Sequence, residues 1–290
     1  MKSNILKLLV AGSICVSAFG LGFRISPGTI LLNEAPVGKP YDFATERNQA
    51  IRIGPVNYDM TYELHAEPAG AGNSSATGYF DFLNPEWFSL AAETVFISAG
   101  DVAEVPMWLN IAEDEGLYNH HWLLGIPVTP ISVGGGATQI QVGGYLQFRF
   151  ETEAKAGVVP QCAQSELVAV PSTIKFEDMM PGMDRIEIAE LYHGRQHSLM
   201  YRVERLDPDS DVARITILGT PGYPRLEHPE WIEYPTEAVV PGSDEGGGPF
   251  PITVKIPQGE QVRRFEEILL LKNNQTKTAF IRILVNIKQI

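Results

Sequence analysis

Asn84-Pro85-Glu86-Trp87-Phe88 and His228-Pro229-Glu230-Trp231-Ile232 are two copies of one segment, 144 residues apart. Each copy is followed by a run of alternating apolar side chains, from Val105 to Ile111 after the first and from Phe250 to Ile256 after the second. Alternation of this kind is typical of a half-buried β-strand. The chain therefore contains a duplicated β unit and is predicted to fold as two similar β domains in tandem.

The register between the copies extends well beyond this segment. Pro106 and Pro251 are 145 residues apart, and residues 145–150 match residues 280–285 at an offset of 135. The fall from 145 to 135 places about ten extra residues in the last hairpin of copy one. Repeats in solenoid proteins are only about 20–50 residues long. A repeat of this size is therefore a duplication of a whole domain.

We predict an all-β chain of two tandem immunoglobulin-like antiparallel β-sandwich domains related by internal duplication. The predicted division is a signal peptide over 1–20, sandwich domain 1 over 24–153, a linker over 154–169 and sandwich domain 2 over 170–290. The linker contains a glycine and a proline that interrupt regular structure. The length of 290 residues agrees with two domains of about 100–200 residues each.

The N-terminal segment has the pattern of a secretory signal peptide. Lys2 and Lys7 supply the positive charge, the stretch from Leu8 to Val16 is apolar, and Val16-Ser17-Ala18 is a small-residue cleavage site. The alternative is an uncleaved anchor, but the apolar stretch from Leu8 to Phe23 is 16 residues long, short of the roughly 20 that span a bilayer. We expect a bacterial extracytoplasmic protein, periplasmic or at the cell surface, with no transmembrane span in the mature chain.

Charge and cysteine content restrict the function further. The formal net charge of -13 argues against nucleic acid as a partner, because phosphate backbones are bound by clustered lysine and arginine. Removal of the signal peptide leaves Cys162 as the single cysteine, so no internal disulfide can form. The stability of the mature chain must therefore come from burial and strand pairing.

Two local clusters contain residue types that bind metal ions. The segment from Asp207 to Asp211 resembles the start of an EF-hand loop, but Val212 stands where that loop needs glycine and Leu218 where it needs glutamate. His193 and His197 are four residues apart without the helix that would bring them together. No nucleophile, phosphate or dinucleotide motif is present. We predict no catalytic residue, no metal ligand and no cofactor, and hence a protein that is not an enzyme.

The order of motifs resembles the bacterial immunoglobulin-like sandwich repeats of the major sperm protein and pilus-chaperone type. The resemblance is carried by Pro85-Glu86-Trp87, Gly100, Val105 to Ile111, Gly116-Leu117-Tyr118 and Trp122 to Ile126, with Val262 and Arg263 in place of Leu117 and Tyr118 in copy two. It covers nearly all of the mature chain and implies a fold rather than an activity. Domains of this type serve in adhesion, scaffolding and strand-mediated binding of partners.

We therefore expect a binding or scaffold protein of the cell envelope that acts through protein-protein contacts. The first alternative is a periplasmic chaperone for surface fibres, a family that anchors a client C-terminus with basic residues of a cleft. The sequence alone does not identify such residues. The second alternative is a carbohydrate-binding module or enzyme accessory, in which Trp87 and Trp231 would form an exposed platform for sugar. We expect these two tryptophans to fill the two cores instead.

The extra residues in copy one mark a candidate contact with the partner. The hairpin from Pro127 to Gly144 has no counterpart in copy two and carries apolar side chains beside a run of glycines. Apolar residues on a projecting hairpin have little core to join, so a neighbouring protein is expected to cover them. The candidate contact residues are Ile131, Val133, Ile140 and Val142.

Overall fold

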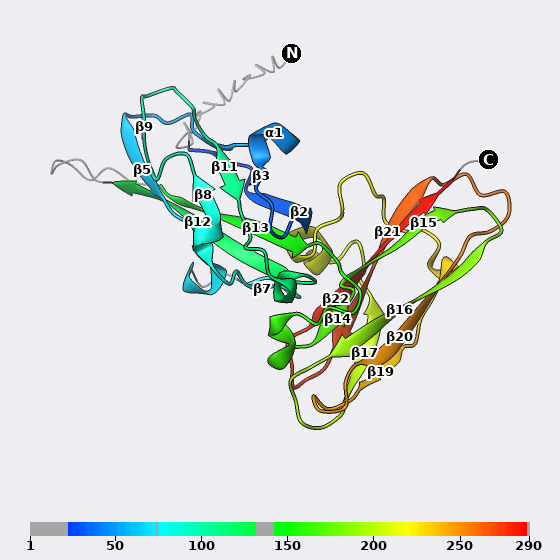
Figure 1. Ribbon diagram of the computed structural model, residues 1–290. Coiled ribbons are helices and arrows are strands. Elements are labelled where there is room, and N and C mark those ends of the chain that lie inside the picture. The colour runs from blue at the N-terminus through cyan, green and yellow to red at the C-terminus, as the bar shows by residue number, and fades with distance from the viewer. Residues whose placement is uncertain (1–22, 73–74, 132–141, 289–290) are drawn as a thin grey trace, which may run out of the picture.

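The computed structural model describes residues 23–72, 75–131 and 142–288, and these residues form two β-sandwiches joined end to end (Figure 1). Three sheets contain the strands of the first half and two sheets contain those of the second half. Among the described residues, no strand of one half pairs with a strand of the other. The predicted all-β class with two tandem immunoglobulin-like sandwiches is thereby confirmed.

The first sandwich packs a five-strand path, β2-β13-β12-β5-β9, against two smaller sheets, β1-β4-β10 and β3-β11-β8. The strands are β1 (Ile25–Ser26), β2 (Thr29–Ala35), β3 (Tyr41–Asp42), β4 (Ile51–Ile53), β5 (Met60–Leu64), β6 (Glu67–Pro68), β7 (Phe80–Asp81), β8 (Phe88–Leu90), β9 (Thr94–Ile97), β10 (Ala103–Val105), β11 (Met107–Leu109), β12 (His121–Ile131) and β13 (Gly144–Thr152). Strands β6 and β7 pair with β12 beside this path.

The second sandwich repeats this plan with fewer breaks. Its sheets have the orders β15-β22-β21-β17-β19 and β14-β16-β20-β18. The strands are β14 (Val168–Val170), β15 (Thr173–Met179), β16 (Asp184–Tyr192), β17 (Leu199–Arg205), β18 (Ile232–Glu233), β19 (Glu237–Val240), β20 (Gly248–Lys255), β21 (Arg264–Lys272) and β22 (Ala279–Ile287). Strand β14 lies largely within the expected linker. The domain boundaries given above stay a prediction.

The helical elements are all short. They are α1 (Phe43–Arg47), the 3₁₀ turns η1 (Ala69–Gly72), η2 (Pro85–Trp87), η3 (Glu115–Leu117), η4 (Gln161–Gln164) and η6 (Pro229–Trp231), and the π-helical turn η5 (Val212–Thr216). The motif that opens each copy is thus a 3₁₀ turn, η2 or η6, with its proline at the first position. The alternating run from Ala213 to Ile217 predicts a strand, but this prediction is wrong, because η5 occupies that place. No helix among the described residues has the length and apolar content of a membrane span.

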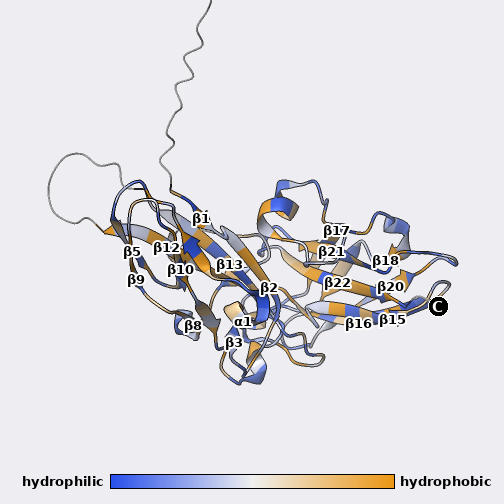
Figure 2. Ribbon diagram, turned by 90° about the horizontal axis from the view of Figure 1, so that it is seen from above, coloured by the Kyte–Doolittle hydropathy of each residue, from blue (hydrophilic) through white to orange (hydrophobic). Residues whose placement is uncertain are grey.

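Alternating side chains build a separate core in each sandwich. The first core is rich in aromatic rings, including Phe43, Phe148 and Phe150, and the second in aliphatic side chains such as Ile252 and Ile283, all of them buried. Figure 2 shows orange and blue residues alternating along the strands of both halves. At about 25 cal/mol per Å² of buried apolar surface, these cores supply the main stabilisation of a chain without a disulfide.

The sandwiches are not purely antiparallel, which corrects the prediction. Strand β1 pairs antiparallel with β4, after which the chain crosses to the opposite sheet at Pro27, and β2 runs parallel to β13. Strands β14 and β15 make the same crossing at Pro171, and β15 runs parallel to β22. The first strand of each copy is therefore shared between two sheets.

The helix α1 is an insertion in copy one. In copy one, Tyr41 pairs with Leu109. The equivalent pair in copy two is Arg185 with Val254, which lie 144 and 145 residues further along the chain. Further along, Ile53 pairs with Ala103 in copy one, and Leu191 pairs with Gly248 in copy two. Ile53 and Leu191 are therefore equivalent, but they are only 138 residues apart (191 − 53). Copy one therefore has six more residues here, and they form α1 and its flanks in place of the continuous strand β16.

A third apolar cluster joins the two sandwiches. Tyr79 and Leu123 come from the first half, and Ile217, Ile268 and Phe280 from the second. The ring centroids of Tyr79 and Phe280 lie 5.4 Å apart. Side chains of both halves share this buried cluster, so the two sandwiches pack against each other at this junction.

Candidate functional site

An exposed apolar row crosses the outer face of the first sandwich at the end remote from the second. Thr61 in β5 pairs with Phe96 in β9 on one side and with Ile131 in β12 on the other. Directly paired residues point to the same face of a sheet. Phe96 is 63% exposed and Ile131 is 38% exposed. We call the row Phe96, Thr61 and Ile131 the end face.

The local sequence explains why this face is apolar. In β9, Val95 and Ile97 point toward the core while Phe96 points outward. In β12, Val128 is buried, whereas Ile131 lies at the phase that faces solvent. Side chains alternate across a strand, so a strand that is apolar at both phases must expose one set. The end face is therefore a direct consequence of sequence patterning in two separate strands.

Two of the four sequence-predicted contact residues can be placed. Ile131 ends β12 on the end face, and Val142 is half-buried just before β13. Val133 and Ile140 lie outside the described residues. Sequence reasoning missed Phe96, although the run Thr94-Val95-Phe96-Ile97 carries the signal, since three successive apolar residues cannot all point inward.

Among the described residues, no strand pairs with the first residues of β13 on the edge that β2 occupies further along. Strand β2 accompanies β13 only from Gln147 onward, so Gly144 to Leu146 precede it. The side chain of Ile25 covers Gly144 so closely that a Cβ atom added to Gly144 would lie 2.3 Å from Ile25 Cδ1.

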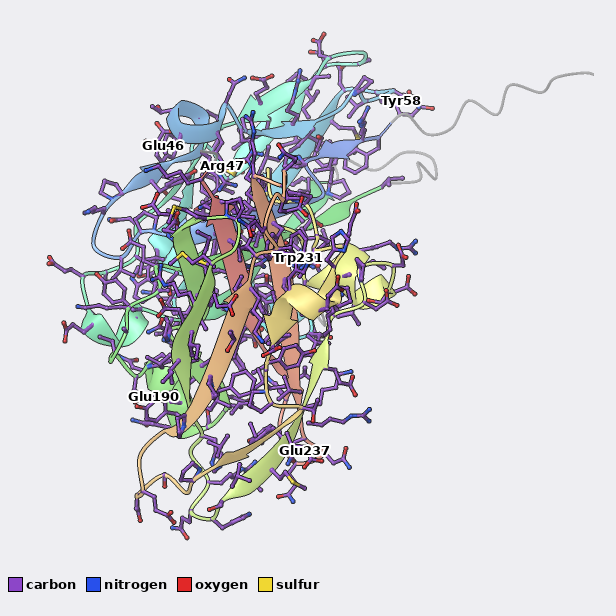
Figure 3. All side chains as sticks on the ribbon, turned by 90° about the vertical axis from the view of Figure 1, so that its right-hand side faces the viewer. Glu46, Arg47, Tyr58, Glu190, Trp231 and Glu237 are labelled. Carbon is purple, nitrogen blue, oxygen red and sulfur yellow. The ribbon has the colours of Figure 1, made fainter. Side chains whose placement is uncertain are left out.

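Figure 3 places Tyr58, another exposed aromatic residue, at the opposite end of the molecule from Glu237 in β19.

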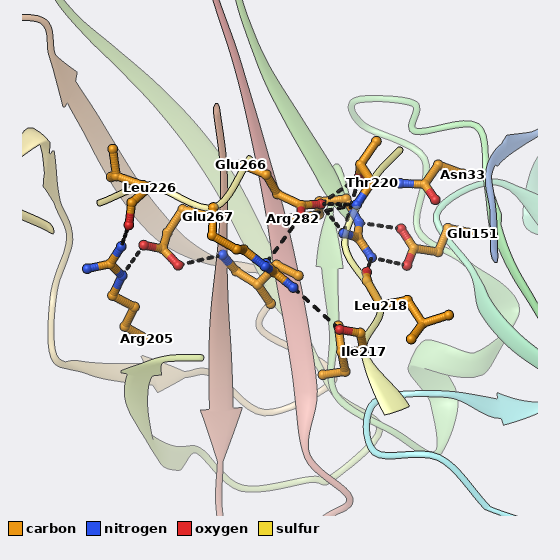
Figure 4. A network of polar contacts seen from close by, with 12 residues as sticks. Asn33, Glu151, Arg205, Ile217, Leu218, Thr220, Leu226, Glu266, Glu267 and Arg282 are labelled. Atoms are coloured by element: carbon orange, nitrogen blue, oxygen red, sulfur yellow. Dashed lines mark hydrogen bonds and ion pairs between the residues drawn. The ribbon is translucent and has the colours of Figure 1, made fainter. Parts of the chain in front are cut away.

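The charged residues at the junction form a buried network, drawn in Figure 4. Arg282 of β22 donates from Nε to Glu151 Oε2 of β13 at 2.6 Å and from Nη1 to Glu266 Oε1 of β21. All three side chains are at most 1% exposed. Tyr79 donates to Glu151 Oε1 at 2.6 Å. Burial alone would raise the pKa of Glu151, but Arg282 holds it below its ordinary value.

A second buried arginine lies beside this network. Arg149 of β13 donates from Nη2 to Ile215 O at 2.6 Å and to Gln147 Oε1 at 3.0 Å. Its Nε and Nη1 atoms have no acceptor within hydrogen-bonding distance in the described part of the chain. Because Ile215 belongs to η5 in the second half, Arg149 also ties the two sandwiches together. Neither junction arginine is open to solvent.

Two histidines at the junction are held neutral. His121 is stacked on Phe280 of the second half with ring centroids 4.0 Å apart, and burial lowers its pKa to about 4. His120 is stacked on Trp122, and burial likewise lowers its pKa to about 4, although Gly116 O accepts from its ring. Transfer of a charged imidazolium into this apolar setting is costly.

The remaining candidates have structural roles. Trp231 is buried in the second core, as expected, while Trp87 is half-buried and packs against Trp122 with centroids 6.0 Å apart. His193 is buried and its Nε2 bonds to Val240 O. Burial raises the pKa of the Cys162 thiol to about 12. Within residues 23–72, 75–131 and 142–288, no group of three acidic, histidine or cysteine side chains is placed to hold a metal ion.

Comparison with known proteins gives similarity at the level of fold. No family model matches the chain, and no curated protein matches it. Among solved structures, the periplasmic chaperone SfaE is 10% identical, with 90% of this chain and 99% of that chain covered and a TM-score of 0.30. The class 5 fimbriae chaperone CfaA is 8% identical, with coverages of 90% and 99% and a TM-score of 0.32. A protein of unknown function from Porphyromonas gingivalis W83 is 10% identical, with coverages of 91% and 99% and a TM-score of 0.32.

Proposed function

We propose that the chain is a non-enzymatic extracytoplasmic protein that binds another protein through the end face. The observation that carries this proposal is the row of Phe96, Thr61 and Ile131, which exposes two large apolar side chains on the two sides of Thr61. Contiguous exposed apolar side chains are typical of protein-binding surfaces. The extracytoplasmic location rests on the signal-peptide pattern in the first 20 residues.

The chemistry of the described residues supports a binding role rather than catalysis. The Cys162 thiol, with its pKa at about 12, is protonated near neutral pH and is a poor nucleophile. His120 and His121 are covered by aromatic rings and are closed to solvent. The buried carboxylate of Glu151 is already paired with Arg282. Glu151 and His121 contact Arg282 and Phe280 of the second sandwich, so their role is to join the two halves.

A chaperone for surface fibres is the second candidate. The short edge of β13 from Gly144 to Leu146, which β2 does not cover, favours it because such a chaperone offers an exposed strand edge to its client. The burial of Arg149 and Arg282 disfavours it, because such a chaperone needs basic residues that a client can reach. Both arginines instead donate to acceptors inside the chain. Co-purification with a fibre subunit and an outer-membrane usher would favour the chaperone; co-purification with another envelope protein would favour the scaffold.

Phe96→Ser is expected to weaken partner binding at least about tenfold, because exposed aromatic residues at the centre of an interface carry a large share of its binding energy. Thermal stability should change little, since the side chain is 63% exposed. The measurement is the dissociation constant for the partner captured from an envelope extract by the wild-type chain. The matched control is Val239→Ser, at an equally exposed apolar residue of the second half. Equal losses for both variants would contradict the proposal.

A further inference from the structure

Strand β16 has a long free edge in the second sandwich. Strand β20 pairs with it from Asp184 to Leu191, all but its last residue. On the other edge, β14 pairs only with residues 190–192, because the chain then crosses to the opposite sheet at Pro171. The described part of the chain supplies no backbone partner for residues 184–189 on this side.

The backbone groups of alternate residues point toward this edge. Ile256 donates its backbone N–H to Met183 O, so the carbonyl of Met183 points toward the β20 side. Successive residues of a strand direct their N–H and C=O groups to opposite sides. The groups of Asp184, Ile186 and Ile188 therefore point away from β20 and face the open edge. Unpaired edges of this kind are templates for another strand.

At the centre of this edge, the side chains on the outer face are apolar and those on the other face are charged. Ile186 is 62% exposed and Ile188 is 56% exposed. Arg185 and Glu187 alternate with them, and Arg185 Nε donates to Glu187 Oε1 at 2.7 Å. Both charged side chains remain about one-third exposed, at 38% and 34%. Glu187 therefore keeps lone pairs for a second cation, and Arg185 keeps donors for a second carboxylate.

The first sandwich covers the equivalent place. There, α1 interrupts the strand, Phe43 is fully buried in the core and Arg47 donates to Leu31 O at 2.7 Å. An added strand would meet this helix rather than an edge. The difference between the two copies shows that the fold can close this edge, and that copy two leaves it open.

We propose that two copies of the chain associate through β16, as an antiparallel strand pair with its two-fold axis at Ile186. In this register Ile186 lies opposite Ile186, and Arg185 of each copy lies opposite Glu187 of the other. Asp184 lies opposite Ile188, so no like charges face each other. The residues whose backbone groups face the edge are then directly paired, which satisfies them in both copies. A two-fold strand pair is self-complementary and closes as a dimer.

Neighbouring registers are less favourable for physical reasons. An axis at Glu187 would place Glu187 opposite itself and Asp184 opposite Glu190, which opposes like charges across the pair. An axis at Ile188 would extend the new strand to residues 190 and beyond, where β14 already occupies the edge. The charge pattern of β16 thus selects a second copy in one register.

The test is sedimentation equilibrium from micromolar to millimolar concentration. The wild-type chain is expected to show a monomer–dimer equilibrium, and Ile186→Lys is expected to raise the dissociation constant at least about tenfold, because two lysines would face each other at the axis. Circular dichroism of the variant should match the wild type. Val239→Lys, on the edge strand β19 of the other sheet, is the matched control and should dimerise normally.

Charge reversal gives an independent arm. Arg185→Glu and Glu187→Arg are each expected to weaken the dimer, because each creates like-charge pairs across the axis, and the double variant is expected to restore it. A wild-type chain that stays monomeric at every concentration would overturn the proposal. The proposal would then be wrong even if β16 paired with a different protein. A dimer that Val239→Lys weakens and Ile186→Lys does not, or a double variant without recovery, would also overturn it.

Discussion

Replacing Arg282 with methionine is expected to lower the free energy of unfolding by about 3–5 kcal/mol, because removing one member of a buried ion pair leaves its partners buried and uncompensated. Arg282 is fully buried between Glu151 and Glu266, and it also donates to Thr220 Oγ1 at 3.2 Å. Glu151 belongs to the first sandwich and Arg282 to the second, so the variant should also loosen the junction. Urea unfolding monitored by tryptophan fluorescence measures the loss.

The control for this experiment is Arg202→Met. Arg202 is exposed and pairs with Glu204 at 3.0 Å on the surface, so its loss should cost less than about 1 kcal/mol. Small-angle scattering of Arg282→Met should show a wider distribution of interatomic distances than that of the wild type. If Arg282→Met unfolded at the wild-type urea concentration and kept the wild-type scattering curve, the junction would not depend on this network.

Acidification is expected to destabilise the protein between pH 6.5 and pH 4, by about 3 kcal/mol for each of His120 and His121. Burial lowers the pKa of both histidines from 6.5 to about 4. The unfolded chain therefore binds more protons than the folded chain in this window, and stability falls as the pH falls through it. Above pH 6.5 both states carry neutral histidines and the effect vanishes. Urea unfolding across this range measures the slope.

The variant His121→Phe isolates one of the two contributions. It keeps an aromatic ring against Phe280 and removes the titrating group. The number of protons taken up on unfolding, which the slope of unfolding free energy against pH measures, should therefore fall by about one. Glu267, whose pKa burial raises, acts in the opposite direction near pH 4.5, and the comparison of variant with wild type cancels it. A variant with the wild-type slope would show that His121 does not titrate with unfolding.

The sequence was sufficient for the all-β class and the two tandem sandwiches, because the duplicated pattern marks the strands twice. The 144-residue offset between the Pro-Glu-Trp segments corresponds to η2 and η6, which occupy equivalent places in the two sandwiches. Helix α1 was not predicted, since five residues are too few for a helical period. Its signal is the cap: Asp42 accepts from the backbone N–H groups of Ala44 and Thr45. The run at 213–217 alternates like a strand but forms η5, where Ile215 O accepts from Arg149 of the first sandwich.

The candidate site was harder to predict than the fold. Ile131 was identified from the insertion in copy one, but its neighbour Phe96 lies 35 residues earlier (131 − 96), and only the pairing of β5 with both strands brings them together. The buried network has the same origin. Glu151 and Arg282 are 131 residues apart, and neither has a local partner that would have marked it. Long-range pairs of this kind depend on how the two sandwiches pack.

The most direct test of the proposed binding role is site-specific photo-crosslinking in the native envelope. A photoreactive phenylalanine derivative is placed at Phe96 and at Ile131 on the end face, and at Leu83, an exposed residue of the same sandwich outside it. The account predicts that positions 96 and 131 yield an adduct with one and the same protein and that position 83 does not. Adducts that form equally at all three positions, or none at 96 and 131, would contradict it.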